Sequence, residues 1–430
     1  MTKPFDVNGP LRIAYLTYRG KPHVGGQGVY SRHLTKALAD LGHHVEVFSG
    51  QPYPILDPRI KMHKLPSLDI FNDHNPGRFP AYWELNTWPN LVEAGLFLKG
   101  TFGEPLSFSM RAHRVLRDRI NDFDLVHDNQ CLGSSILKIE KIIPTIVTLH
   151  HPITKDRKLE MAHTQTWWKR QAIGRWYSFV WMQGRVASKM PRVVVVSENS
   201  INDIHTDMGV SKDRMRLVPV GVDPDLFKPI PSIKRKPAHL ITTASADVAL
   251  KGLSFLLEAL AKLRTEREVH LTIIGKPRAG ASADLIESLG LQDCISYVSG
   301  VTDEQIVELY AASELAVVPS LYEGFSLPAI EAMSTGICLV ATTGGALPEV
   351  TGRDGETVLS CPPADTEALA AAIRRGLDDP QLREKIGLAG RQRVAERWSW
   401  RHCAQLTVDQ YREVLSMPQN VRKLAKRDAK

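Results

Sequence analysis

The sequence has few cysteines, and they lie far apart. The chain contains five cysteines, at Cys131, Cys294, Cys338, Cys361 and Cys403. They form no close pair along the sequence, which argues against a disulfide framework and against a zinc site. No apolar run reaches the roughly 18 residues that a transmembrane helix needs. The N-terminus lacks an apolar stretch followed by a small-residue cleavage site, so we expect a cytoplasmic protein rather than an exported one.

The sequence also lacks a strong charge excess and any nucleic-acid motif. The 54 basic and 47 acidic residues leave a net charge of +7, which is compatible with nucleic acid, an anionic membrane surface or a phosphate-bearing substrate. Without a zinc finger or an RNA-recognition signature, we expect no nucleic-acid partner. Apolar residues make up 43% of the chain, which excludes a largely disordered protein, and its 430 residues are enough for two or three domains.

Short β-branched runs alternate with helical patterns in both halves of the chain, which is typical of parallel α/β sheets. The candidate strands are 11–18, 44–49, 124–128, 145–151 and 192–197, then 239–245, 270–275, 295–300, 315–320 and 338–343. Helical spacing of apolar residues separates them, as in 28–41, 253–264 and 303–313. The pattern predicts two Rossmann-like, doubly wound domains that face a central cleft, each binding ligands at the carboxyl ends of its strands.

A proline-rich stretch separates the two halves. Five prolines between Pro219 and Pro237 forbid a continuous helix, so we place the linker there. We predict an N-terminal acceptor-binding domain over 1–218, closed by the C-terminal segment 398–430, and a C-terminal nucleotide-sugar-binding domain over 219–397. Residues 66–110 are expected to form an irregular insertion, and the polar, basic tail 419–430 is expected to fray.

Two glycine-containing loops are candidate phosphate sites. Gly25 and Gly26 follow the first strand and precede a helix, an arrangement that suits an anion or, equally, a plain tight turn. Their spacing is not G-x-G-x-x-G, which removes the main support for NAD chemistry. The later stretch 275–282 lacks a GK[ST] helix start, so an ATPase is disfavoured.

The densest feature is PSLYEGFSLPAIEAM at 319–333. Glu323 and Glu331 lie on either side of a turn, and Pro328 fits the first turn of a helix. The amide N–H groups of the residues before it are then free for phosphate, while carboxylates accept hydrogen bonds from sugar hydroxyls. Taken alone, the two glutamates could equally be solvated residues on a surface turn.

EGFSLPAIE resembles the E-x7-E motif of the retaining GT-B glycosyltransferases of family 4. Further similarity to that family runs in order along the chain, in stretches at 25–26, 147–152, 193–198, 218–223, 250–252 and 344–356 and in the closing RWSW. The resemblance implies a GT-B fold and transfer of a hexose, mannose or glucose, from a nucleotide diphosphate sugar to a saccharide or glycolipid hydroxyl. It also implies retention at the anomeric carbon and no required metal or other cofactor.

The resemblance assigns roles to individual residues. It implies that Glu331 holds the donor ribose and Glu323 the donor sugar, that Lys251 binds phosphate, and that His150 contacts the reacting sugar. His151 competes with His150, because neighbouring residues of a strand point to opposite faces. The diphosphate is expected to meet backbone amides from both domains: Gly25, Gly26, Gly324, Phe325, Ser326 and Leu327.

One position departs from the family pattern. The arginine usually found about six residues before the lysine is replaced here by Ser245 or its neighbour. A serine hydroxyl donates one neutral hydrogen bond, which is weaker than a charge-assisted one. Lys276 or Arg278 could supply the missing charge, and a degenerate, non-catalytic sugar-nucleotide-binding protein remains an alternative. A second alternative is a sugar-nucleotide epimerase or hydrolase on the same scaffold.

The donor base is expected to lie near Val301 and Asp303. The Asp303 carboxylate could accept from guanine and so favour GDP-mannose, with UDP-glucose as the competitor. However, Thr302 and Gln305 form a capping-box pattern, in which Asp303 would only favour the first turn of a helix. The Asp-x-Asp pairs at 122–124 and 223–225 lie at a strand start and in the linker, so we interpret both as structural rather than metal-binding.

Aromatic residues are concentrated in the predicted acceptor domain. The stretch 167–185 interleaves Trp167, Trp168, Trp176 and Trp181 with basic residues. It could contact a carbohydrate acceptor or, peripherally, the inner face of a membrane. The helical spacing of Trp168, Trp176 and its apolar neighbours favours a third interpretation, a helix packed in the core.

Overall fold

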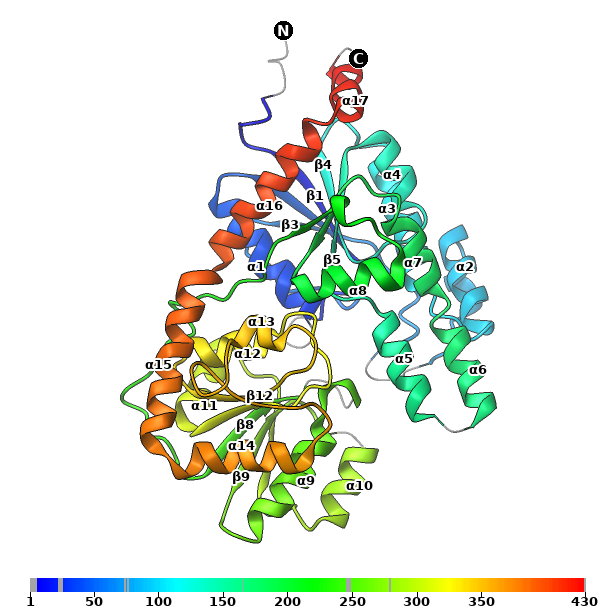
Figure 1. Ribbon diagram of the computed structural model, residues 1–430. Helices are drawn as coiled ribbons and strands as arrows, with labels where there is room; N and C mark the ends of the chain where they lie inside the picture. Colours follow the sequence, from blue (N-terminus) through cyan, green and yellow to red (C-terminus); the bar gives the residue numbers. More distant parts are fainter. Residues whose placement is uncertain are drawn as a thin grey trace. The chain divides into compact units, whose positions relative to one another are not determined.

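The computed structural model describes residues 6–21, 26–72, 75, 77–164, 166–244, 249–277 and 280–428. The chain divides into two compact units (Figure 1). The first unit comprises Met1–Val196, Ser200–Val218 and Arg401–Lys430, and the second comprises Ser197–Asn199 and Pro219–Trp400.

The described part of the first unit contains a seven-stranded parallel sheet in the order β3-β2-β1-β4-β5-β6-β7. Its strands are β1 (Arg12–Thr17), β2 (His44–Ser49), β3 (Lys61–Lys64), β4 (Leu125–Asn129), β5 (Thr145–Leu149), β6 (Val193–Val195) and β7 (Met215–Leu217). Its helices are α1 (Gly26–Asp40), η1 (Tyr82–Glu84), α2 (Trp88–Leu98), α3 (Glu104–Leu116), α4 (Ile136–Ile142), α5 (Thr154–His163), α6 (Trp167–Trp176), α7 (Phe179–Ala187), α8 (Glu198–Met208), η2 (Lys212–Arg214), α16 (Trp400–Leu415) and α17 (Pro418–Asp428).

The second unit repeats this architecture with a six-stranded parallel sheet, order β10-β9-β8-β11-β12-β13, among its described residues. Its strands are β8 (His239–Thr243), β9 (His270–Ile274), β10 (Ile295–Val298), β11 (Leu315–Val318), β12 (Cys338–Thr342) and β13 (Leu359–Cys361). Its helices are η3 (Ala249–Lys251), α9 (Leu253–Arg264), α10 (Ala281–Ser288), α11 (Asp303–Ala312), α12 (Leu327–Ser334), α13 (Leu347–Thr351), α14 (Thr366–Asp378) and α15 (Pro380–Arg397).

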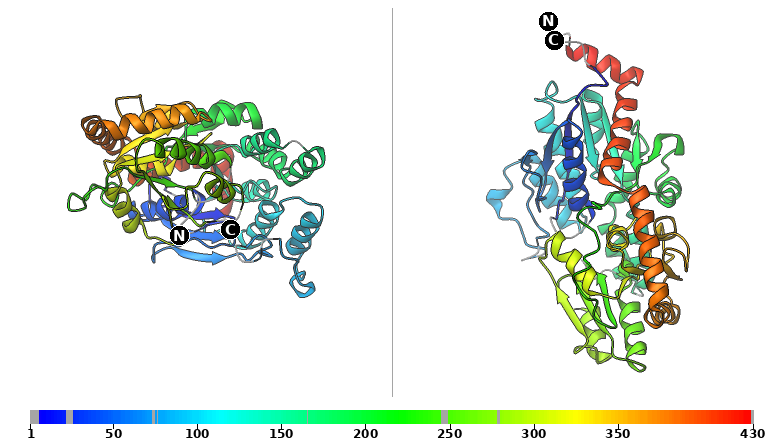
Figure 2. Two further views of the ribbon diagram at one scale, coloured as in Figure 1. Left: turned by 90° about the horizontal axis from the view of Figure 1, so that it is seen from below. Right: turned by 90° about the vertical axis from the view of Figure 1, so that its left-hand side faces the viewer.

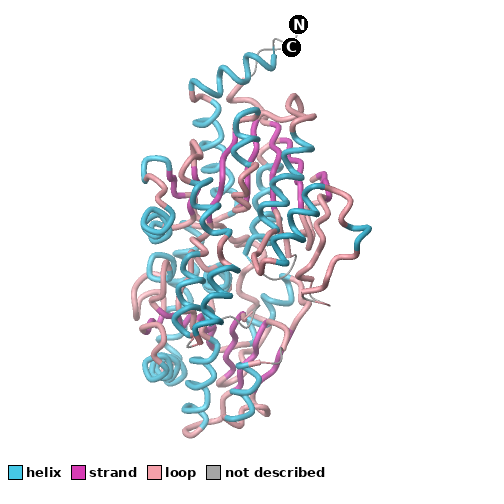
Figure 3. The backbone as a smooth tube through the Cα atoms, turned by 90° about the vertical axis from the view of Figure 1, so that its right-hand side faces the viewer, coloured by secondary structure: helices cyan, strands magenta, loops and turns pink. Residues whose placement is uncertain are grey.

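The central strands of both sheets are buried on their two faces. Every residue of β4, β5, β11 and β12 is buried, as expected for parallel strands covered by helices. Figure 3 shows helices on either side of the strands of the first unit. In the second unit α9 buries Leu256, Leu257, Leu260 and Leu263 at helical spacing, which explains why this segment is a helix facing the sheet.

In each sheet the order of the strands reverses at one point, and this switch point is where ligands are expected to bind. The strand order reverses between β1 and β4 in the first unit and between β8 and β11 in the second. In open parallel sheets, ligands bind beyond the carboxyl ends of the strands at this switch point. The loops after β1 and β4, and those after β8 and β11, are therefore where functional side chains are expected.

The two parallel-sheet domains predicted from the sequence are confirmed, and all ten expected strands are present. Three short edge strands, β3, β7 and β13, were missed because three or four residues carry little periodic signal. The proline-rich linker contains no helix between Leu217 and His239, as predicted. No described helix is long and apolar enough to span a membrane.

Two local predictions were wrong. The tail was expected to fray, but its described residues form α17 (Figure 2). Ion pairs of Lys423 with Glu140 and of Arg427 with Asp124 hold this helix against the rest of the first unit. Residues 66–110 were expected to be irregular, but they include α2 and the start of α3. Thr87 caps α2, and Pro89 sits in its first turn, a position where proline favours a helix.

Candidate functional site

Lys251 and the loop after β11 lie together at the switch point of the second sheet. Lys251 ends η3, which follows β8, and the loop 319–326 follows β11. The Lys251 Nζ donates to Glu323 Oε1 at 2.8 Å, and the Ser320 hydroxyl donates to the same oxygen at 2.7 Å. Glu323 is buried, whereas the Lys251 side chain is 29% exposed. The structure thus brings two predicted site residues into direct contact.

Close backbone packing holds this loop in place. Gly252 has a φ of +63°, and a Cβ at that position would lie 2.0 Å from the Pro319 carbonyl oxygen. On the other side, a Cβ at Gly345 would lie 2.3 Å from the Glu323 carbonyl oxygen. Any side chain at these glycines would push the loop away. The glycines of the LKG and GGALPEV motifs therefore position Glu323 rather than contact a ligand through side chains.

The start of α12 presents unused backbone donors. Ser326 precedes the helix with a φ of +90°, a conformation that non-glycine residues rarely adopt. Among the described residues, the N–H groups of Phe325, Ser326 and Leu327 donate to no protein acceptor, and the buried Ser326 Oγ also has no partner. Phe325 is anchored edge-on against Trp398, with ring centroids 5.8 Å apart. Such donors at a helix start favour a bound anion.

Glu331 lies one turn further along α12, in surroundings that disfavour its charge. Burial, and to a lesser degree the nearby Asp303 carboxylate, raises the pKa of Glu331 to about 8. The ligand-free side chain is therefore mostly protonated at neutral pH. The carboxylate form accepts from both hydroxyls of a diol such as a ribose, so ribose binding is expected to require loss of this proton.

Val301 and Asp303 follow β10, an edge strand of the second sheet, and Asp303 is near enough to Glu331 for its charge to act on that carboxyl. Thr302 Oγ1 accepts from the Gln305 N–H, and Gln305 Oε1 accepts from the Thr302 N–H, so the predicted capping box is confirmed. Asp303 is the first residue of α11 and Val301 is partly exposed before it. Lys276 is exposed on the loop after β9. Gly25, Ser245 and Arg278 lie outside the described residues.

His150 follows β5 in the first unit and faces its interior. Its Nε2 lies 2.8 Å from Asn129 Oδ1, and its backbone N–H donates to Gln130 Oε1 at 2.7 Å. The Tyr30 ring packs edge-on against the imidazole at 4.6 Å between centroids. Burial, with a smaller contribution from the neighbouring His151, lowers the pKa of His150 to about 3. The imidazole is therefore neutral and serves as a hydrogen-bonding group rather than a charge.

His151 takes a different direction. Its Nε2 pairs with Asp156 Oδ2 at 2.9 Å, which ties the strand end to α5. Of the two histidines, His150 is the one packed beside Asn129 at the switch point. Gly26 begins α1, whose residue Tyr30 contacts His150.

Several contacting residues were not predicted. Asn129 and Gln130 orient His150, and Ser320 orients Glu323. Asn129 and Gln130 had a signal, since polar residues directly follow a buried strand at the switch point. Ser320 had been noted only as part of a Pro-Ser motif and given no role.

In each Asp-x-Asp pair, one carboxylate is engaged by hydrogen bonds within the protein. Asp124 accepts from the backbone and the guanidinium of Arg12, and Asp223 accepts from the Asp225 and Leu226 N–H groups. In the part of the chain that the structure describes, no cluster of three or more His, Cys, Asp or Glu side chains could hold a metal ion.

The core interpretation of 167–185 is wrong for its first half. The stretch forms two helices separated at Tyr177–Ser178, and no described residue of α6 is buried. Trp167 and Trp168 are 74% and 55% exposed, whereas Trp176 packs against the core and Val180 is buried. Helical spacing alone did not reveal this break, because apolar residues continue through it.

Two family models match the chain. The model "Glycosyltransferase Family 4" matches residues 24–226, and "Glycosyl transferases group 1" matches residues 228–393. Over 94% of its length the chain is 48% identical to the MMP α-(1→4)-mannosyltransferase of Mycolicibacterium hassiacum, covering 99% of that protein. It is 24% identical to the D-inositol 3-phosphate glycosyltransferase of Streptomyces bingchenggensis, over 94% of this chain and 90% of that one.

Solved structures share the fold across almost the whole chain. Sucrose-phosphate synthase from Thermosynechococcus elongatus matches with a TM-score of 0.72 and 23% identity, covering 94% of this chain and 99% of the other. Anabaena Alr3699/HepE, solved in complex with UDP and glucose, matches with a TM-score of 0.69 and 18% identity, covering 93% and 99%.

Proposed function

Because the chain belongs to glycosyltransferase family 4 and is a hexosyltransferase of the GT-B fold that uses a nucleotide sugar, we propose that it transfers mannose from GDP-mannose to a saccharide hydroxyl, forming an α-(1→4) linkage. The observation that carries the choice of sugar and linkage is the 48% identity to a mannosyltransferase over nearly the full length of both proteins.

The second unit supplies the groups for a diphosphate leaving group. As the bond from the sugar to the diphosphate breaks, negative charge grows on the phosphate oxygens. We assign its stabilisation to the Lys251 ammonium and to the unused N–H groups of Phe325, Ser326 and Leu327 at the positive end of α12. Lys251 is held by Glu323 in the ligand-free chain and would turn from that carboxylate toward the phosphate.

The two glutamates keep the roles that the family resemblance implies. Glu323 binds hydroxyls of the transferred sugar, since its second oxygen, Oε2, is available beside the one that Lys251 and Ser320 occupy. Glu331 binds the ribose diol. Gly324, Val301 and Asp303 are assigned to the donor, and Gly25, Gly26 and Ser245 to the diphosphate, from the resemblance alone. His150, as a neutral hydrogen-bonding group, is assigned to the reacting sugar.

We further propose that the reaction needs no metal ion. This rests on the available protein donors: one ammonium and three amides at a helix start can stabilise the charge of a leaving diphosphate without a divalent cation. Peripheral contact with a membrane stays a proposal, favoured by the exposed Trp167 and Trp168 beside Lys169 and Arg170.

A donor and metal assay tests the proposal. The protein is incubated with an α-(1→4)-linked manno-oligosaccharide and, in parallel, GDP-mannose or UDP-glucose, with and without EDTA. We expect transfer from GDP-mannose in both conditions, and NMR of the product should show an α linkage. Transfer from UDP-glucose alone would refute the donor assignment, and complete loss in EDTA would refute the metal-free mechanism. Release of mannose without any acceptor would favour the hydrolase alternative.

A further inference from the structure

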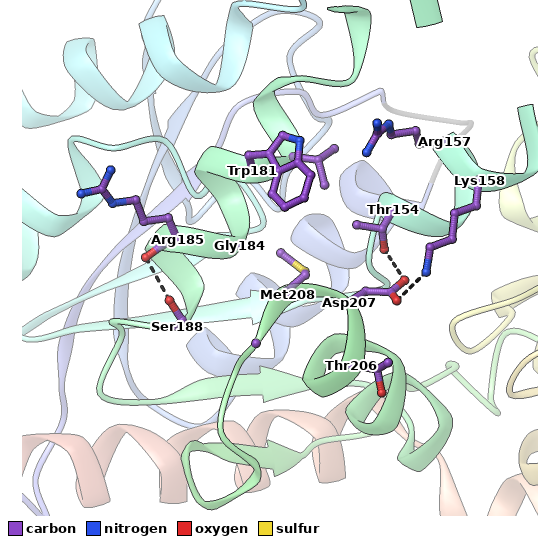
Figure 4. Close-up of a pocket in the computed structure, with 12 residues that line it drawn as sticks. Thr154, Arg157, Lys158, Trp181, Gly184, Arg185, Ser188, Thr206, Asp207 and Met208 are labelled. Carbon is purple, nitrogen blue, oxygen red and sulfur yellow. Dashed lines mark hydrogen bonds and ion pairs between the residues drawn. The ribbon is translucent and has the colours of Figure 1, made fainter. Parts of the chain in front are cut away.

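A pocket in the first unit lies away from the groups assigned above. It has a volume of about 510 Å³ and is lined by α5, α7, the end of α8 and the residues that follow α7 and α8 (Figure 4). This volume falls within the range of about 300–1,000 Å³ that is usual for small-molecule sites. The pocket begins at Thr154, the first residue of α5. His151, which does not line the pocket, pairs with Asp156 in the first turn of the same helix.

A carboxylate with two donors forms one wall of the pocket. Asp207 Oδ1 accepts from Lys158 Nζ at 2.6 Å and Oδ2 from the Thr154 hydroxyl at 2.7 Å. The Asp207 side chain is only 5% exposed, whereas that of Lys158 is 64% exposed. The bonds to Lys158 and Thr154 hold the pKa of Asp207 below its usual value, although burial works against them. This arrangement combines acceptors and donors within one group, which suits neighbouring hydroxyls on a ring.

An aromatic face forms the opposite wall. The Trp181 side chain is 71% exposed, and Figure 4 shows its indole facing the same space as Met208. The Arg157 guanidinium lies 6.0 Å from the indole ring. Arg157 also lines the pocket, so a cationic side chain stands beside the indole. A flat exposed indole beside hydrogen-bonding groups fits a ligand with an apolar ring face and polar edges.

We infer that this pocket is a saccharide subsite, which binds a non-reacting pyranose of the acceptor chain with its ring on Trp181 and its hydroxyls on the Asp207–Lys158 pair. The inference rests on the proposed function, because it takes the acceptor to be a saccharide. A neutral pyranose uses the carboxylate as well as the cations, whereas an anionic headgroup would leave Asp207 opposing it. The subsite explains why Trp181 is left uncovered beside a buried carboxylate.

The first test measures binding without any donor. We expect α-(1→4)-linked mannotetraose to bind the wild type with a dissociation constant roughly in the millimolar range by calorimetry. Trp181→Ala should weaken this binding roughly tenfold, because the stacking surface is removed. Asp207→Asn, which keeps the shape of the side chain, should also weaken it. Trp88→Ala is the matched control, since Trp88 is 68% exposed on α2 and does not line the pocket.

The second test measures turnover with the same oligosaccharide. Trp181→Ala should raise KM for mannotetraose roughly tenfold with little change in kcat, while Trp88→Ala should match the wild type. Because Trp181 is exposed, the Trp181→Ala protein should have the melting temperature of the wild type. A loss of affinity can then be distinguished from misfolding. Equal KM values in both variants would overturn the subsite while leaving the proposed mannosyl transfer intact.

The calorimetric test keeps the two proposals distinguishable. Binding of mannotetraose that depends on Trp181 supports the subsite even if GDP-mannose is not the donor. Absence of any binding to the wild type overturns it. Sedimentation with phosphatidylcholine–phosphatidylglycerol vesicles tests whether this surface binds a membrane instead. The inference is wrong if mannotetraose does not bind and if Trp181→Ala abolishes binding to the vesicles.

Discussion

The two units build their functional regions in contrasting ways. In the second unit, Lys251 and Ser320 both donate hydrogen bonds to Glu323. Gly252 and Gly345 allow close backbone contacts that hold the loop of Glu323 in place. In the first unit, Trp181 of α7 stays exposed beside an open pocket. From this contrast we expect the groups assigned to the leaving diphosphate to be held firmly by the backbone, and the surface proposed for the acceptor to vary from one enzyme to another.

The largest effect should follow from removing the ammonium group. Lys251→Ala is expected to lower kcat/KM by about 10²- to 10³-fold, since the leaving charge loses its closest cation. Lys276→Ala, an exposed lysine on the neighbouring loop, is the control and should change the rate by less than about threefold. A comparable loss in both variants would show that the charge is shared between loops. The assignment of the leaving-group charge to Lys251 alone would then be wrong.

The next largest effect should be on folding. Gly252→Ala is expected to lower the free energy of unfolding by about 2–4 kcal/mol, because its methyl group would collide with the Pro319 carbonyl oxygen. Gly290→Ala is the matched control: its φ of +65° is nearly the same as the +63° of Gly252, but no atom lies within 4 Å of the added Cβ. It should cost only about 1–2 kcal/mol, the strain of a left-handed residue. Urea unfolding of both variants separates packing from backbone strain.

A smaller effect should distinguish the two histidines of the first unit. His150→Ala is expected to lower kcat by about 10- to 100-fold, because it removes a positioned hydrogen-bonding group. His151→Ala should have little effect on kcat, since this side chain is engaged by Asp156. Steady-state kinetics at saturating donor measures both. The opposite ranking would reassign the reacting-sugar contact to His151.

The smallest effect should be a pH dependence of nucleotide affinity. The pKa of Glu331 is raised to about 8, so the carboxyl is protonated at pH 7 and must lose its proton if the ribose hydroxyls bind the carboxylate form. The affinity for GDP should then increase with pH, by at most about tenfold per unit below pH 8, and level off above it. Glu331→Gln, in which only the phosphates titrate, provides the baseline for calorimetry. Identical profiles would show that Glu331 binds the ribose in its protonated form.

The raised pKa of Glu331 also makes the free energy of unfolding depend on pH. Because the folded chain holds the Glu331 proton to a higher pH than the unfolded chain, its contribution is greatest below about pH 4 and is lost as pH rises toward 8. Glu331→Gln should therefore flatten the decline of unfolding free energy over that interval.

The sequence was most informative where the site is local. Glu323, Phe325, Ser326 and Glu331 lie within one loop and helix, so a nine-residue motif was enough to place them, and the capping box at Thr302 was equally readable. The aromatic stretch 167–185 was harder. Its helical spacing was correct within each helix, but the break at Tyr177–Ser178 and the exposure of Trp167 and Trp168 depend on which other helices cover them.

The positions of the strands along the chain and the local hydrophobic pattern were therefore determined by the sequence itself, because a parallel sheet covered on both faces needs the same short apolar runs wherever it occurs. Contacts between distant segments were decided only in the tertiary structure: Lys251 against Glu323, His150 against Asn129, and Asp207 facing Trp181 across a pocket. Each joins residues whose separation along the chain carries no periodicity. Their geometry follows instead from where parallel strands end and which backbone atoms a glycine allows to meet.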